Sequence, residues 1–152
     1  MKPIPILLGL AIFASANFLP FQNLLAQLPD LTATATIDFG DGNVVNATSR
    51  GGSFDRVGLL PSQVVSVTVQ LPLTKAGDTI TIEPLDGGSV FGPSNQAVVA
   101  ADGTFSFTFQ AGQDPGVCQV SLHDGTQEMG LQFWVLNQQN PQENPPVINS
   151  TN

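Results

Sequence analysis

Reactive side chains are scarce in this sequence. Its 152 residues include one cysteine, Cys118, and one histidine, His123. A lone cysteine forms no internal disulfide, and a structural zinc site would lack its thiolate and imidazole ligands. Serine hydrolases need a positioned imidazole base, and the sequence has no Gly-x-Ser-x-Gly turn to expose a nucleophile. We therefore expect no catalytic residues, no cofactor and no metal site, and we predict that the chain is not an enzyme.

Positive charge is also scarce. Lys and Arg number 4 against 12 Asp and Glu, so the net charge is −8 at pH 7. So few basic residues cannot neutralise a run of phosphates, which excludes nucleic acid as a partner. Charged residues make up only 11% of the chain, and Ser, Thr, Asn and Gln supply most of its polarity. This composition is typical of exported β-proteins.

Residues 1–26 have the pattern of a cleaved signal peptide. Lys2 supplies a positive n-region, residues 4–13 form an apolar h-region, and a small-x-small cleavage pattern ends at Ala16. A second cleavage position follows Ala26. We expect cleavage after one of these two alanines, and a mature chain that is secreted, extracellular or periplasmic.

The mature chain is expected to have no membrane span. Asn17 and Pro20 interrupt the N-terminal apolar run well short of the ~20 residues that cross a bilayer. No C-terminal apolar stretch follows that could act as a stop-transfer helix. Residues 137–152 are instead rich in Asn, Gln and Pro, and this composition predicts a disordered tail.

Apolar and polar residues alternate with a period of two through the middle of the chain. Side chains of a β-strand point to opposite faces in turn, so the alternation predicts strands with one buried and one wet face. Such strands pack as antiparallel sheets, face to face. About seven strands are expected, a number typical of sandwiches, at 33–39, 65–71, 79–83, 96–101, 104–109, 118–123 and 131–135.

Asp-Gly pairs punctuate these strands. They suit tight type I′ turns, whose two central residues both need positive φ. The pair at Asp102-Gly103 is expected to join strands 96–101 and 104–109. The pair at Asp124-Gly125 is expected to join the last two strands. Further pairs stand at Asp41-Gly42 and Asp86-Gly87.

Three phrases resemble immunoglobulin-like domains of bacterial exported and surface proteins. They are residues 75–80 (KAGDTI), 101–107 (ADGTFSF) and 114–120 (DPGVCQV). In that family the last phrase usually reads Pro-Gly-x-Tyr, and Cys118 stands where the tyrosine would be. The paired cysteines of antibody-type domains are absent. The resemblance covers residues 64–135 and implies an all-β, immunoglobulin-like antiparallel β-sandwich. With the strand expected at 33–39, we expect this domain to span residues 27–136.

Residues 37–42 (IDFGDG) are similar to a phrase of PKD domains, another extracellular sandwich family. Ile37 stands where that family has tryptophan, and we interpret the phrase as a shared local turn. Asp38, Asp41 and Asn43 place hard oxygen donors in this loop, as calcium prefers. Their spacing matches no EF-hand and turn chemistry explains them equally well, so whether the loop binds calcium stays open.

The remaining candidate residues have structural explanations. Cys118 alternates in phase with Val120 and Leu122, which predicts an inert thiol in the core. His123 alternates out of phase, which predicts an exposed residue beside a turn. Trp134 falls on the face opposite its apolar neighbours, either as an exposed contact residue or as a cover for a sheet edge or loop.

With no catalytic constellation, the favoured interpretation is a non-catalytic binding or adhesion module outside the cytoplasm. Its partner would be a protein or glycan at a surface. The alternative is a structural or accessory subunit of an extracellular or cell-surface assembly, in which exposed sheet edges accept a strand from a neighbour. The oligomeric state is not indicated by the sequence.

Overall fold

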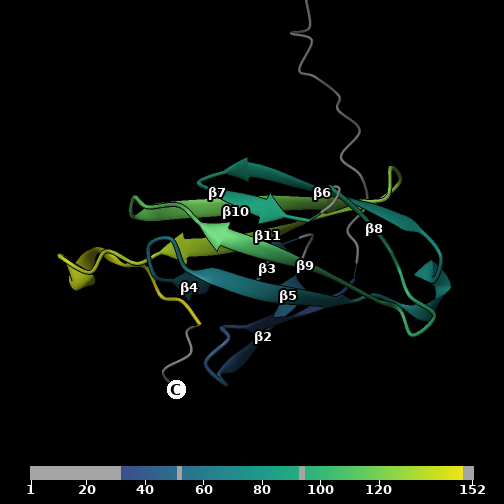
Figure 1. Cartoon of the computed structure of the whole chain (residues 1–152), viewed down its shortest axis with the longest axis horizontal. Coiled ribbons are helices and arrows are strands. Elements are labelled where there is room, and N and C mark those ends of the chain that lie inside the picture. The colour runs from purple at the N-terminus through teal and green to yellow at the C-terminus, as the bar shows by residue number, and fades with distance from the viewer. Residues whose placement is uncertain (1–31, 51–52, 93–94, 149–152) are drawn as a thin grey trace, which may run out of the picture.

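The computed structural model describes residues 32–50, 53–92 and 95–148 (Figure 1). The signal-peptide interpretation of residues 1–26 lies outside this part. Within it, eleven strands and two short 3-10 turns make up the regular structure. The strands are β1 (Thr34–Asp38), β2 (Val44–Arg50), β3 (Ser53–Phe54), β4 (Val57–Leu59), β5 (Val64–Gln70), β6 (Thr79–Asp86), β7 (Gly88–Phe91), β8 (Gln96–Val98), β9 (Thr104–Ala111), β10 (Gly116–His123) and β11 (Glu128–Val135). The 3-10 turns are η1 (Leu73–Lys75) and η2 (Pro141–Glu143).

The strands form two layers of an all-β sandwich. The first layer has the order β7-β9-β5-β1-β2, and the second has the order β3-β11-β10-β6-β8 with β4 also on β11. The short β2–β3 pairing carries the hydrogen bonds from one layer to the other. Pairing is antiparallel except where β3 and β4 lie parallel to β11. The hydrogen-bonded path therefore begins at β7 and ends at β8, two strands that are consecutive in the chain.

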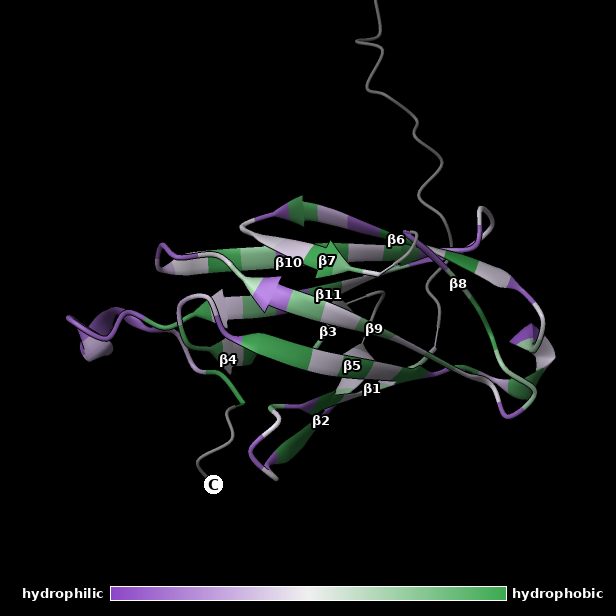
Figure 2. Cartoon of the chain, viewed as in Figure 1, coloured by the Kyte–Doolittle hydropathy of each residue, from purple (hydrophilic) through white to green (hydrophobic). Residues whose placement is uncertain are grey.

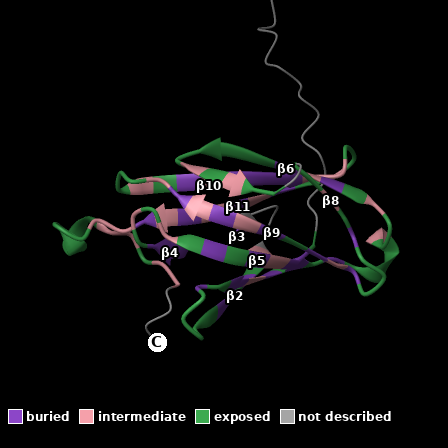
Figure 3. Ribbon diagram, in the orientation of Figure 1, coloured by how far each residue is buried: buried purple, intermediate pink, exposed green. Residues whose placement is uncertain are grey.

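The core lies between the layers, as the alternation of apolar and polar residues predicts (Figures 2 and 3). In β9 the burial alternates so that Phe105, Phe107 and Phe109 point inward. Phe109 stacks on Phe133 of β11, with ring centroids 4.6 Å apart, and so joins the two layers at the centre. Burial of one such ring stabilises the fold by roughly 2–3 kcal/mol. The β-sandwich expected from the sequence is thus present.

The chain crosses from β6 to β7 through a pair of closely packed glycines. A Cβ on Gly87 would lie 2.5 Å from the carbonyl oxygen of Val117, and one on Gly88 would lie 2.3 Å from a ring carbon of Phe109. Gly87 also has a positive φ of 67°, which glycine adopts without steric cost. A side chain at Gly87 would therefore clash with β10, and one at Gly88 would clash with β9.

The Asp-Gly turns are present, but the type I′ geometry expected for them is wrong. Positive φ falls on the glycine of each pair, and the positive-φ residue outside glycine in the described chain is Ser62. The aspartates instead use their carboxylates. Those of Asp41, Asp102 and Asp124 each accept the backbone N–H two residues further on. This side-chain turn replaces the backbone geometry that a tight hairpin would need.

The seven expected strands are all present, and their connections are partly different. Asp124-Gly125 lies in the β10–β11 hairpin, as expected. Asp102-Gly103 does not close a hairpin, because β8 pairs with β6 in the second layer while β9 pairs with β5 and β7 in the first. The turn therefore passes between layers. Strands β2, β3, β4 and β7 were not expected.

Residues 137–148, whose composition predicts a disordered tail, make hydrogen bonds to one another and to β4. The backbone N–H of Asn137 donates to the side chain of Asn144 at 2.7 Å, and the Asn144 amide donates back to the Asn137 carbonyl. Ile148 then pairs in parallel with Val57, and Gly58 donates to the Ile148 carbonyl at 2.8 Å. The segment adds backbone hydrogen bonds to the open side of β4. Residues 149–152 lie outside the described part.

Candidate functional site

The outer surface of the first layer carries an array of hydroxyl and amide side chains, which we call the polar face. Val44 and Val64 are exposed beside it, at the first residues of β2 and β5. The polar face arises because each strand that turns its apolar residues inward must turn the alternate residues outward. Asp38 borders it at the end of β1, and the described residues that compose it carry no charge. Its members are Thr34, Thr36, Asn46, Thr48, Ser66, Thr68, Gln70, Thr104, Ser106 and Thr108.

Hydrogen bonds between neighbouring strands hold the polar face in place. The register aligns Asn46, Thr36, Thr68 and Ser106 in one row across four strands. The Thr36 hydroxyl donates to the Asn46 side-chain oxygen at 2.9 Å, and the hydroxyls of Thr68 and Ser106 lie 2.9 Å apart. Cross-strand pairs of this kind stabilise a sheet by about 0.2–1 kcal/mol each. These two hydrogen bonds link β1 to β2 and β5 to β9 across the polar face.

A groove of about 400 Å³ opens beside the polar face, where the hydrogen-bonded path is interrupted between β7 and β8. We call it the seam groove. Both layers contribute to it, because β9 and β5 belong to the first layer and β6 and β8 to the second. It is lined by Ser66, Ile82, Phe91, Gly92, Gln96, Ala97, Ser106, Phe107 and Thr108.

The backbone of Ser106 faces the seam groove. In an antiparallel strand, the N–H and C=O of alternate residues point to the same side. The Thr104 carbonyl accepts a bond from Ala100, away from β5, and Thr108 pairs with Phe91 of β7. Ser106 lies between them and must point the same way. Since β7 ends at Phe91, no described strand pairs with Ser106 on that side.

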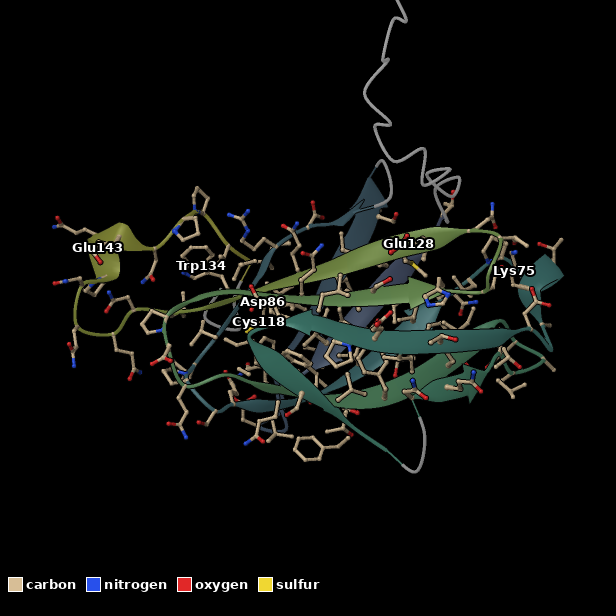
Figure 4. The ribbon with its side chains drawn as sticks, turned by 90° about the horizontal axis from the view of Figure 1, so that it is seen from above. Lys75, Asp86, Cys118, Glu128, Trp134 and Glu143 are labelled. Atoms are coloured by element: carbon tan, nitrogen blue, oxygen red, sulfur yellow. The ribbon has the colours of Figure 1, made fainter. Side chains whose placement is uncertain are left out.

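Cys118 is the buried thiol that the sequence predicted. It is 1% exposed, and its S–H donates to the Gly87 carbonyl at 2.7 Å. Burial raises the pKa of the Cys118 thiol above its ordinary value. Figure 4 shows Cys118 beside Asp86, whose negative charge also opposes thiolate formation. A nucleophile needs the thiolate, so this environment suits packing.

His123 lies at the other end of β10 from Cys118. Five residues of extended strand separate them, which is about 17 Å. They therefore cannot act as a nucleophile and base. His123 is half-buried at the strand end, opposite Glu128 and Thr81 on the neighbouring strands. The sequence predicted an exposed residue beside a turn, and the position beside the turn is confirmed.

An ion pair next to His123 ties the hairpin turn to η1. The Lys75 ammonium donates to Asp124 Oδ2 at 2.5 Å, with side-chain exposures of 18% and 6%. Burial opposes ionisation of Asp124, but hydrogen bonds from Lys75, Thr126 and Gln127 outweigh it and hold its pKa well below the usual range. The same hydrogen bond raises the pKa of Lys75. Every partner here is part of the fold, so the pair acts as a structural tether.

The loop considered for calcium uses its carboxylates locally. Asp38 Oδ1 accepts the backbone N–H of Gly40 at 2.8 Å, and Asp41 Oδ1 accepts that of Asn43 at 3.0 Å. The hydrogen bonds from Asn43 lower the pKa of Asp41. Over the described residues, no group of three or more His, Cys, Asp or Glu side chains could hold a metal ion. Turn formation accounts for the side-chain hydrogen bonds of these two carboxylates.

Trp134 is half-buried rather than freely exposed. It stands opposite Gly58 of β4, and the Arg56 guanidinium lies 5.6 Å from its ring centroid. Such a cation–π contact contributes about 0.5–2 kcal/mol. Figure 4 places Trp134 beside the C-terminal segment that carries Glu143. This arrangement fits the expectation that Trp134 covers a neighbouring loop better than that of a contact residue.

The sequence did not indicate Phe91 or the seam groove. Phe91 lies in a four-residue strand that follows two glycines, and its alternation is too short to identify. The groove residues come from strands β5 to β9, whose pairing partners the sequence does not specify. The sequence signal that could have indicated a strand here was the pair of apolar β-forming residues at 90–91, which stand between glycines.

No protein-family model, no curated protein and no solved structure matches this chain. In the described part, no helix has the length and hydrophobicity to cross a membrane.

Proposed function

We propose that this protein is an exported, non-catalytic binding or adhesion module of immunoglobulin-like type, which engages its partner through the polar face. The observation that carries the proposal is the polar face itself. It is an uncharged array of hydroxyl and amide groups, partly linked by hydrogen bonds between strands, on a protein with a net charge of −8. Hydroxyls and amides both donate and accept hydrogen bonds, so the face suits a neutral polar partner.

Two further points support this proposal. The pattern of residues 1–26 favours export to a place where surface partners are found. Cys118 and His123 have surroundings that suit packing and turn formation, so the residues best able to perform chemistry have structural explanations.

A charge placed on the polar face tests the proposal. Thr36→Lys would put a desolvated, unpaired ammonium at the centre of the contact, and the matched control Gln132→Lys places it on the outer face of the second layer. Labelled protein should bind saturably to the surface of cells of the source organism. We expect Thr36→Lys to weaken binding at least tenfold and Gln132→Lys to leave it unchanged. Absence of saturable binding, or equal binding by both variants, would refute the proposal.

One observation favours the second candidate, a structural subunit that accepts a neighbouring strand. The path of strands ends at β8, where Val98 is 65% exposed. Alternation along β8 points the Val98 N–H away from β6, toward where an added strand would lie. Val98→Pro removes that donor, and Val98→Thr keeps it. In sedimentation experiments, assembly lost in the first variant and kept in the second would support this candidate, whereas a monomer at high concentration would exclude it.

A further inference from the structure

The seam groove lies between β7 and β8. No strand pairing among the described residues joins the two layers there, and the connection is the chain that leads from one strand to the other. The path of strands ends at β7 on one layer and at β8 on the other, and residues 92–95 separate these strands in the chain. Strand β7 pairs with β9 in the first layer, and β8 pairs with β6 in the second. The groove is therefore lined by residues of both sheets.

The size and lining of the seam groove suit one ring of a small ligand. Its volume of about 400 Å³ falls within the range of roughly 300–1,000 Å³ that is typical of ligand pockets. Phe91 is 50% exposed at its rim, although most aromatic rings among the described residues are buried in the core. An exposed ring offers an apolar surface to the C–H groups of a ligand. Ala97 extends this apolar side, and the buried Ile82 also lines the groove.

Hydroxyl groups beside Phe91 provide hydrogen bonds. The hydroxyls of Ser66, Ser106 and Thr108 line the groove. The register sets Ser66 opposite Thr108 and Thr108 opposite Phe91, so the hydroxyls and the ring occupy one row. The backbone N–H and C=O of Ser106 add a donor and an acceptor whose positions the strand fixes. One side of a ligand would thus contact apolar groups and its edge would meet hydroxyls.

Charge narrows the class of ligand. No charged side chain stands among the described residues that line the groove. A cation would find no carboxylate there, and an anion would have to approach a protein of net charge −8 without a basic partner. A neutral molecule with both hydroxyl groups and an apolar C–H face satisfies these conditions. A pyranose ring of a neutral saccharide has this chemistry.

An extended peptide fits the groove less well. Strand addition depends on several consecutive edge groups, and the open edge of β9 offers those of Ser106 alone between the partners of Thr104 and Thr108. We propose that the seam groove binds one ring of a neutral saccharide, with Phe91 against its C–H face and Ser106 and Thr108 at its hydroxyls. This inference rests on the proposed function and specifies its ligand. The remaining rings of a chain would lie on the polar face.

Titration of the mature protein with neutral hexasaccharides tests the inference. The probes are cellohexaose and maltohexaose, with hexagalacturonate as the charged comparison and a neutral hexapeptide as the peptide comparison. Amide resonances and calorimetry report the site and the affinity. We expect a neutral hexasaccharide to shift the Ser106 and Thr108 amides. We also expect Phe91→Ala to weaken binding at least tenfold. The matched control is Leu85→Ala, another half-exposed apolar residue outside the groove, and it should bind as the parent does.

Three outcomes would overturn the inference. They are no binding of either neutral saccharide, tighter binding of the charged saccharide or the peptide, and saccharide binding that Phe91→Ala leaves unchanged. These outcomes are distinct from failure of the proposed function. If Thr36→Lys abolishes cell-surface binding while Phe91→Ala does not, the polar face is the contact surface and the groove is not a saccharide site. If neither variant affects cell-surface binding, both proposals fail.

Discussion

Replacing Asp124 by asparagine should separate the charge of this residue from its role in the turn. Lys75 donates to Oδ2, whereas the N–H groups of Thr126 and Gln127 and the Thr126 hydroxyl donate to Oδ1. Asparagine keeps Oδ1 as an acceptor and replaces Oδ2 with an amide that cannot accept. Exposed ion pairs contribute up to about 1 kcal/mol, and loss of one partner from a buried pair costs about 3–5 kcal/mol. With exposures of 18% and 6%, we expect Asp124→Asn to lower the free energy of unfolding by about 2 kcal/mol.

The pH dependence follows from the direction of the two pKa shifts. The pKa of Asp124 in the folded protein lies below its ordinary 3.8, so its contribution is present above that value and is lost as pH falls toward the folded pKa. The pKa of Lys75 is raised above 10.5, so its contribution is lost only as pH rises through that higher value. The parent exceeds Asp124→Asn in free energy of unfolding, and this difference should shrink by about 1 kcal/mol between about pH 6 and about pH 3. The reason is that Asp124 takes up a proton at a higher pH in the unfolded chain than in the folded protein.

Urea unfolding followed by the fluorescence of Trp134, the one tryptophan of the chain, measures these values. A double-mutant cycle uses Asp124→Asn, Lys75→Met and the double variant. It isolates the coupling between Lys75 and Asp124 from the unfavourable contact between the new amide and the ammonium. We expect a coupling of about 1–2 kcal/mol at neutral pH. A coupling below about 0.3 kcal/mol, or an advantage of the parent that does not change between the two pH values, would refute the reasoning.

Three further predictions concern packing and the backbone. Gly88→Ala should cost at least about 2 kcal/mol in urea unfolding, because its Cβ would lie 2.3 Å from the ring of Phe109. In the control Gly42→Ala the added Cβ would meet no atom within 4 Å, but the φ of 89° is unfavourable for alanine, so the cost should be about 1–2 kcal/mol. Equal costs for the two variants would argue against the clash at Gly88. Ser62→Gly should raise the melting temperature, since Ser62 has a φ of 60°, and a lower value would contradict this. Cys118 should react with a chromogenic disulfide reagent at least a hundredfold faster in urea than in buffer, because burial raises its pKa; similar rates would show the thiol to be accessible.

Alternation along single strands predicted the sandwich well, because it depends only on neighbouring residues. Phe105, Phe107 and Phe109 are buried as expected, and so is Cys118. The β10–β11 hairpin was also predictable, since both strands are long and a single turn joins them.

Partner choice could not be predicted in the same way. The β8 strand has an Asp-Gly turn after it, which favours a hairpin with β9, yet β8 pairs with β6. Nothing in the local sequence states which of two equally polar edges a three-residue strand will join. The seam groove follows from this choice, so the sequence could not indicate it. Composition also does not register that Asn137 and Asn144 hydrogen-bond each other.

The parallel pairing of β3 and β4 with β11 has a consequence for folding in time. Phe133 lies beside Val57 and Gly130 beside Ser53, so these contacts close loops of more than seventy residues. Contacts this distant in sequence slow folding. The strands of the first layer are all present once Ala111 has emerged during synthesis or translocation, but the second layer needs β11. Until then the inward phenylalanines of β9 have no partner layer, and the nascent chain should depend on a chaperone or on rapid completion to avoid aggregation.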